Sequence, residues 1–150
     1  MPTTSTVPFP RFKLPNIGRF PHLLGRDAAI FRRFLDTPRA QQYIGFDFDI
    51  KVGIYAKDAI QNPSPDANLL AGTLAKRIDA VAFIDQNTLD LIEVKDSNIA
   101  NALGQLLTYK QLFQDTYPNL TVDHLLIVTE KQDPDLQPLV QQFGLQIAIV

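Results

Sequence analysis

The chain of 150 residues contains no cysteine, only two histidines and only three serines. Without cysteine it has neither a disulfide framework nor a thiolate zinc site, and two imidazoles are too few for a multi-histidine metal site. No serine lies in a Gly-x-Ser-x-Gly elbow, and both common glycine-rich phosphate-binding motifs are absent. The usual signatures of thiol, serine and phosphate-loop enzymes are therefore missing.

Long apolar runs are missing as well. The longest aliphatic runs, such as residues 125–128, are far too short to span a bilayer, and the proline-containing N-terminus lacks the apolar core of a signal peptide. We therefore expect a soluble, intracellular (cytoplasmic) protein with no membrane partner. Its length and its hydrophobic content of 45% fit one globular domain.

Positive charge is concentrated near the N-terminus. Residues 1–40 carry a formal net charge of +5 and residues 41–150 one of −7. This asymmetry can place a polyanion over a metal-binding cleft, and the alternative is a solvated basic tail. Residues 1–25 hold five prolines without a helical or alternating period, which predicts an extended, Pro-rich basic arm that lies against the body or hangs free. After this arm we expect a single domain over residues 26–150.

Hydrophobic periodicity predicts the first elements of this domain. Apolar residues at helical spacing indicate a helix that begins at Asp27, its expected N-cap, and ends at Thr37. Alternation over residues 45–53 predicts a half-buried strand. We expect its apolar residues to share one face: Phe46, Phe48, Ile50 and Val52. The proline-containing stretch 54–76 predicts a long irregular loop, either a functional flap or a mobile insertion.

The rest of the chain predicts a strand–helix alternation. Two strands joined by a short turn should pair antiparallel, and a helical crossover should bring in the fourth strand. The result is an α/β fold, a mixed central sheet flanked by helices. The predicted elements are strands 77–84 and 89–95, helix 98–113, strand 125–129, helix 135–143 and a closing strand 145–150.

Two carboxylates and a lysine fall on the adjacent predicted strands. Glu93 and Lys95 alternate onto one side of their strand, roughly 6.5–7 Å apart, and Asp79 lies on the neighbouring strand. Two such carboxylates can hold one hard divalent cation, while a lysine orients the attacking water or stabilises charge on a phosphorane. Because the chain has only two glutamates, about 0.1 Glu-x-Lys triplets are expected by chance. The alternative interpretation is a surface salt bridge across the two strands.

The helix after this strand carries two further polar residues. Gln105 and Tyr109 are four positions apart and therefore lie on one helix face, although this spacing alone carries little information.

Together, Ile78-Asp79, Glu93-Val94-Lys95 and Gln105-x-x-x-Tyr109 resemble the PD-(D/E)XK nuclease superfamily, in its RecB-like branch. The resemblance covers about residues 26–130. It implies a restriction-endonuclease-like αβββαβ core, to which this chain adds a C-terminal helix and strand.

The resemblance also implies a role for each matching residue. Asp79, Glu93 and the backbone carbonyl of Val94 would hold Mg²⁺, for which Mn²⁺ substitutes, and Lys95 would assist the attacking water. Gln105 and Tyr109 would support the site or contact the nucleic-acid backbone.

The chain departs from the family pattern at two points. Ile78 stands where many members have proline, and the first helix lacks the glutamate that many members carry. Asp27 or Asp36 can take that place, but Asp27 is better explained as the helix cap.

Other polar residues stay outside the predicted site. We expect His22 at the surface and His124, just before a strand, at the surface or at a strand edge. Asp47 and Asp49 belong to the polar face of their strand, and Arg32-Arg33 either contacts phosphates or is solvated.

The resulting hypothesis is a metal-dependent (deoxyribo)nuclease of DNA repair or recombination, as an endonuclease or exonuclease. Its expected partner is DNA, with a homodimer or a helicase-type partner extending a small recognition surface. The alternative is a non-catalytic DNA- or protein-binding or assembly protein on the same fold.

Overall fold

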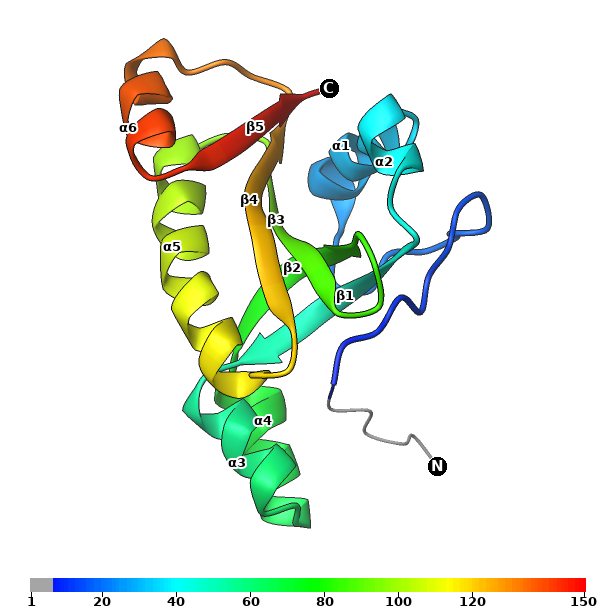
Figure 1. Cartoon of the computed structure of the whole chain (residues 1–150), viewed down its shortest axis with the longest axis vertical. Helices are drawn as coiled ribbons and strands as arrows, with labels where there is room; N and C mark the ends of the chain where they lie inside the picture. Colours follow the sequence, from blue (N-terminus) through cyan, green and yellow to red (C-terminus); the bar gives the residue numbers. More distant parts are fainter. Residues whose placement is uncertain (1–6) are drawn as a thin grey trace.

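A computed structural model describes residues 7–150, so the first six residues of the predicted arm lie outside it. The described chain folds around one open sheet of five strands, with helices on both sides (Figure 1). The predicted α/β class with a mixed sheet is confirmed. None of the helices in residues 7–150 has the length and apolar character needed to cross a membrane.

The strands lie side by side in chain order, and only the first three form a meander. β1, β2 and β3 pair antiparallel, whereas β4 and β5 join in parallel after helical crossovers. The tight turn before β3 is fixed by Asp85, whose carboxylate accepts the Asn87 and Thr88 N–H groups, each at 2.8 Å. The strands are β1 (Gly45–Val52), β2 (Lys76–Phe83), β3 (Thr88–Lys95), β4 (Thr121–Thr129) and β5 (Leu145–Ile149).

Each face of the sheet has its own hydrophobic core. α5 (Ile99–Thr116) and α6 (Gln137–Gln142) cover one face, and α1 (Gly25–Leu35) and α2 (Pro38–Gln41) cover the other (Figure 1). The predicted helix 135–143 is divided between the 3₁₀ turn η1 (Pro134–Leu136) and α6.

The predicted irregular loop over residues 54–76 is wrong. This stretch forms α3 (Ile54–Gln61) and α4 (Pro65–Leu74), a helical hairpin that projects beyond the end of the sheet (Figure 1). Its prolines mark the connection, because Pro65 occupies the first turn of α4, where no N–H is needed. Ser64 caps that helix by accepting the Ala67 N–H at 3.0 Å.

The expectation that the apolar residues of β1 share one face is also wrong. Phe46 and Phe48 join the core beneath α1, whereas Ile50 and Val52 join the core beneath α5. Asp49, between the two pairs, has a left-handed φ of 56°. This conformation breaks the alternation of an extended strand, so the buried side changes at Asp49.

The arm lies against the body over its described part. Phe12 and Phe46 exchange two backbone hydrogen bonds of 2.9 and 2.7 Å, which places the arm beside β1. Ile17, Phe20 and Leu23 are buried in the same core as α1. The structure thus favours the docked arm over the free one.

Candidate functional site

Asp79 and Glu93 converge where β2 and β3 stop pairing regularly. The last paired residues are Ala80 and Ile92, so Asp79 and Glu93 come next on their strands. The Asp79 N–H donates to Glu93 Oε1 at 3.4 Å, and the Val94 N–H donates to Asp79 Oδ2 at 2.9 Å. These cross-strand bonds hold both carboxyl groups at one point of the sheet.

Glu93 is buried, Asp79 is half-buried, and the pair does not form a surface salt bridge with Lys95. Glu93 is only 2% exposed, and Lys95, at the end of β3, is half-buried. Across residues 7–150, Lys95 makes no ion pair within 4.0 Å of either carboxylate. The lysine acts on the pair through its charge, which lowers the pKa of both acids.

Burial dominates the protonation of the two acids. Burial and, after it, the charge of nearby Asp79 raise the pKa of Glu93 to about 9, against the opposing charge of Lys95. Burial also raises the pKa of Asp79, against the Val94 N–H bond that stabilises the ionised form. A pair that resists ionisation in this way lacks positive charge at close range, which a divalent cation would supply.

Asp27 joins the same group from α1, although the sequence indicated an N-cap there. The N-cap is Leu24, and Asp27 stands in the first turn of the helix. Burial raises its pKa, Asp96 and Asp79 raise it further, and Lys95 lowers it. Asp27 therefore lies within electrostatic reach of the centre. The other candidate, Asp36, ends the same helix and is exposed.

Gln105 and Tyr109 reach the centre from α5. Burial and the charge of Glu93 raise the pKa of the Tyr109 hydroxyl, and a hydrogen bond from the Gln105 side chain lowers it. Gln105 Oε1 is buried without a hydrogen-bond partner in the described chain. Carboxylate and amide carbonyl oxygens are the ligands that hard cations such as Mg²⁺ prefer, so the chemistry of Asp79, Glu93 and Gln105 fits that ion.

A neighbouring group, which the sequence hypothesis left out, links the arm to this centre. Asp49 Oδ2 accepts a 2.5 Å bond from Arg77, and its Oδ1 lies 3.8 Å from His22 Nδ1. The charge of His22 also lowers the pKa of Asp79. The imidazole is half exposed, as expected, but it stands beside the carboxylates. No sequence spacing connects residues 22, 49 and 79, because the arm has no periodicity.

A second acidic group lies at Asp90, Asp123 and His124, whose potential ligand atoms are within 4.8 Å of one another. Asp90 is 1% exposed and fully engaged. One oxygen accepts Tyr43 at 2.5 Å and Arg39 at 3.4 Å, and the other accepts both the backbone N–H and Nδ1 of His124 at 2.9 Å. These bonds tie the α2 region to β3 and β4, and a metal would have to break them.

His124 differs from the prediction in lying inside a strand and not just before one. It lies within β4, and its side chain is half-buried against Asp90. The predicted strand began at residue 125, whereas β4 begins at Thr121.

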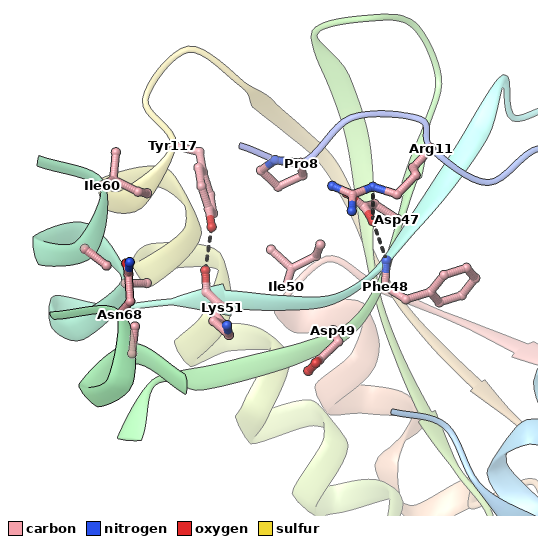
Figure 2. A pocket seen from close by; sticks show the side chains of 13 residues that line it. Pro8, Arg11, Asp47, Phe48, Asp49, Ile50, Lys51, Ile60, Asn68 and Tyr117 are labelled. Atoms are coloured by element: carbon pink, nitrogen blue, oxygen red, sulfur yellow. Dashed lines mark hydrogen bonds and ion pairs between the residues drawn. The ribbon is translucent and has the colours of Figure 1, made fainter. Parts of the chain in front are cut away.

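The cavity in Figure 2, of about 190 Å³, lies between the arm, β1 and the α3–α4 hairpin. Buried Asp47 accepts the Phe9 N–H at 3.3 Å and the Phe48 N–H at 3.0 Å, with Arg11 Nε 3.6 Å away. Tyr117 donates to the Lys51 carbonyl at 2.6 Å. Asp47 thus anchors the arm and Tyr117 joins the end of α5 to β1, and the lining includes neither Asp79, Glu93 nor Lys95.

The adjacent arginines of α1 have protein partners. Arg32 donates to the Ile17 carbonyl at 2.7 Å and lies over the Phe20 ring, 4.2 Å from its centroid. Arg33, together with Arg26, binds Glu130 at 2.8 Å.

Comparison with known proteins returned no match: no family model, no curated protein and no solved structure is similar to this chain.

Proposed function

We propose that this chain is a metal-dependent nuclease of the PD-(D/E)XK type that hydrolyses DNA phosphodiester bonds. One observation carries the proposal. Asp79 of β2 and Glu93 of β3 are linked by hydrogen bonds across the sheet, Glu93 is buried, and Lys95 follows Glu93 on β3. Metal-assisted hydrolysis needs two oxygen ligands and a nearby cation, which this arrangement offers.

The element order gives independent support. α1, β1, β2, β3, α5 and β4 follow the αβββαβ order of a restriction-endonuclease-like core. In that interpretation the α3–α4 hairpin is an insertion between the first two strands, and α6 with β5 is the C-terminal addition. Asp79 then lies in the middle of β2 and Glu93 near the end of β3. The backbone of these paired strands fixes the directions of the two side chains.

Each residue has a distinct role in the proposed reaction. Asp79, Glu93 and the Val94 carbonyl would hold Mg²⁺ or Mn²⁺, with Asp27 contributing negative charge nearby. When bound, the metal polarises the phosphodiester and lowers the pKa of bound water. Lys95 balances the charge of the acids and orients the attacking water by donating from its ammonium group.

The charge distribution favours approach of DNA from the side of the arm and α1. Lys13 and Arg19 are exposed there and have no ion-pair partner in the described chain, whereas the body is acidic. Contacts of this kind neutralise phosphates and weaken as salt rises.

The test is cleavage of single-stranded, duplex, flapped and branched DNA, and of RNA, with Mg²⁺ or Mn²⁺ and with EDTA. We expect metal-dependent cleavage of a DNA substrate that falls at least about 100-fold in Lys95→Ala. Lys110→Ala, an exposed lysine on α5, is the matched control and should keep full activity. Cleavage that persists in Lys95→Ala contradicts the mechanism. A folded protein that binds DNA without cutting any substrate supports the non-catalytic alternative.

A further inference from the structure

The two edge strands of the sheet, β1 and β5, differ in how their outer edges are covered. Along β1 the arm covers the edge, with Phe12 bonded to Phe46, and the strand carries Asp47, Asp49 and Lys51. β5 forms the opposite edge, and in residues 7–150 it pairs only with β4. Natural sheets usually protect such edges with charges, proline, bulges or a covering segment.

Within the part of the chain that the structure describes, β5 has no charge, proline, bulge or covering segment of this kind. Residues 145–150 contain neither a charged side chain nor a proline. Three exposed apolar side chains lie on this strand, on the adjoining α6 and at the C-cap of α6: Ile149 at 44%, Leu139 at 40% and Phe143 at 47% exposure. α6 packs beside β5 (Figure 1), so the bare edge continues into an apolar surface.

The free backbone groups can be assigned by parity. The Val150 N–H donates to the Thr129 carbonyl of β4 at 2.9 Å. The even-numbered residues of this strand therefore direct their backbone N–H and C=O groups toward β4. Because N–H and C=O of one residue point to the same side of a strand, the groups of Leu145, Ile147 and Ile149 face outward.

We infer that β5 is a pairing site for a second copy of this chain. In an antiparallel arrangement with the two-fold axis at Ile147, each Ile147 lies opposite the other, and each Leu145 lies opposite the second copy's Ile149. Every outward donor then meets an outward acceptor. An uncharged strand suits this partner, because a two-fold axis would otherwise bring like charges together.

The same symmetry leaves the two proposed centres independent. Strand direction reverses across the axis, so the Lys95 ends of β3 in the two copies point in opposite directions within one ten-stranded sheet. Dimerisation therefore does not depend on the proposed nuclease function, and neither result decides the other.

The first experiment measures mass in solution by sedimentation over a concentration series. We expect twice the chain mass of 16.8 kDa for the 150-residue chain. Ile149→Lys and Phe143→Glu, both at exposed positions, should weaken the dimer at least tenfold with unchanged circular dichroism. Ile54→Lys and Leu69→Glu, at exposed apolar positions of the α3–α4 hairpin, are the matched controls and should leave the dimer intact.

The second experiment tests the register. Because the chain has no cysteine, Ile147→Cys carries a single thiol. Directly opposed residues of an antiparallel hydrogen-bonded pair have Cα atoms about 5.5 Å apart, within disulfide range. With oxidised glutathione as the oxidant, the two thiols of a dimer should form one disulfide, with reduction of one glutathione disulfide to two thiols. Leu69→Cys should stay uncrosslinked. A monomer at every concentration, or a dimer that tolerates Ile149→Lys and fails to crosslink at residue 147, overturns the inference.

Discussion

At the scale of single residues, Glu93 shows what burial does to an acid. A carboxyl group that is 2% exposed beside a second carboxyl loses the solvation of its charge, and its pKa rises to about 9. Such a group costs stability in the metal-free protein at neutral pH. This cost is understandable if the residue serves a ligand that supplies positive charge.

The raised pKa predicts a pH dependence for the metal-free protein. Between its ordinary value of 4.5 and about 9, Glu93 keeps a proton when folded that the unfolded chain releases. The free energy of unfolding should therefore fall as pH rises through this interval, by up to about 1.4 kcal/mol per pH unit. Glu93→Gln should flatten the profile. Urea unfolding in EDTA at several pH values measures it, with exposed Asp58→Asn as the control; parallel profiles for the parent and Glu93→Gln would refute the assignment.

Asp27 gives a second prediction, because its matched control lies on the same helix. Asp27→Asn removes a negative charge near Asp79 and Lys95, so we expect a roughly 10- to 100-fold higher metal requirement for cleavage. Asp36→Asn changes the same chemical group at the exposed far end of α1 and should have no effect. Equal effects of the two substitutions in a Mn²⁺ titration of cleavage would exclude Asp27 from the site.

The residues brought together at the centre were only partly predictable. Asp79, Glu93 and Lys95 could be predicted because strand spacing and pairing alone bring them close. Asp27 could not, since an aspartate at the start of a helix also suits a cap. His22 reaches the group through the tertiary course of the arm, which no local pattern encodes.

At the scale of elements, β1 shows how one residue redirects a strand. An alternating pattern over residues 45–53 correctly predicts a strand, but alternation cannot reveal the left-handed backbone of Asp49. The residues on either side of it therefore enter different cores. The α3–α4 hairpin was not predicted either, because its sequence pattern is weak. Its two helices bury mainly small alanines, so their apolar periodicity is weak.

The arm is an element without regular structure that nevertheless completes a core. Phe20 is 6% exposed and contacts the rings of Phe31 and Phe48 at 5.2 and 5.5 Å between centroids. Phe20→Ala should therefore lower the free energy of unfolding by about 3–5 kcal/mol. Phe9→Ala, at a 46% exposed position of the same arm, should cost less than about 1 kcal/mol. Chemical denaturation of both variants checks this, and similar small losses would indicate a loosely attached tail.

At the scale of the whole molecule, two acidic clusters lie on the same sheet, and the proposed function places the metal at one of them. In the Asp90 cluster, the two carboxylate oxygens of Asp90 are bonded to Tyr43, Arg39 and His124. These bonds connect the α2 region to β3 and β4. The Asp79–Glu93 pair has fewer partners, and Tyr109, which lies within its electrostatic reach, is bonded to Gln105, whose Oε1 has no hydrogen-bond partner in the described chain. The short distances between potential ligand atoms favour the Asp90 cluster as a metal site. The smaller number of hydrogen bonds to Asp79 and Glu93 favours the second pair.

Direct measurement of Mn²⁺ binding tests this choice most sharply. Calorimetric titration of the metal-free protein should show a site that Asp79→Asn abolishes. Asp123→Asn, in the other cluster, should leave that site unchanged. Binding that survives Asp79→Asn and disappears in Asp123→Asn would place the metal at the Asp90 cluster and contradict the proposed catalytic centre.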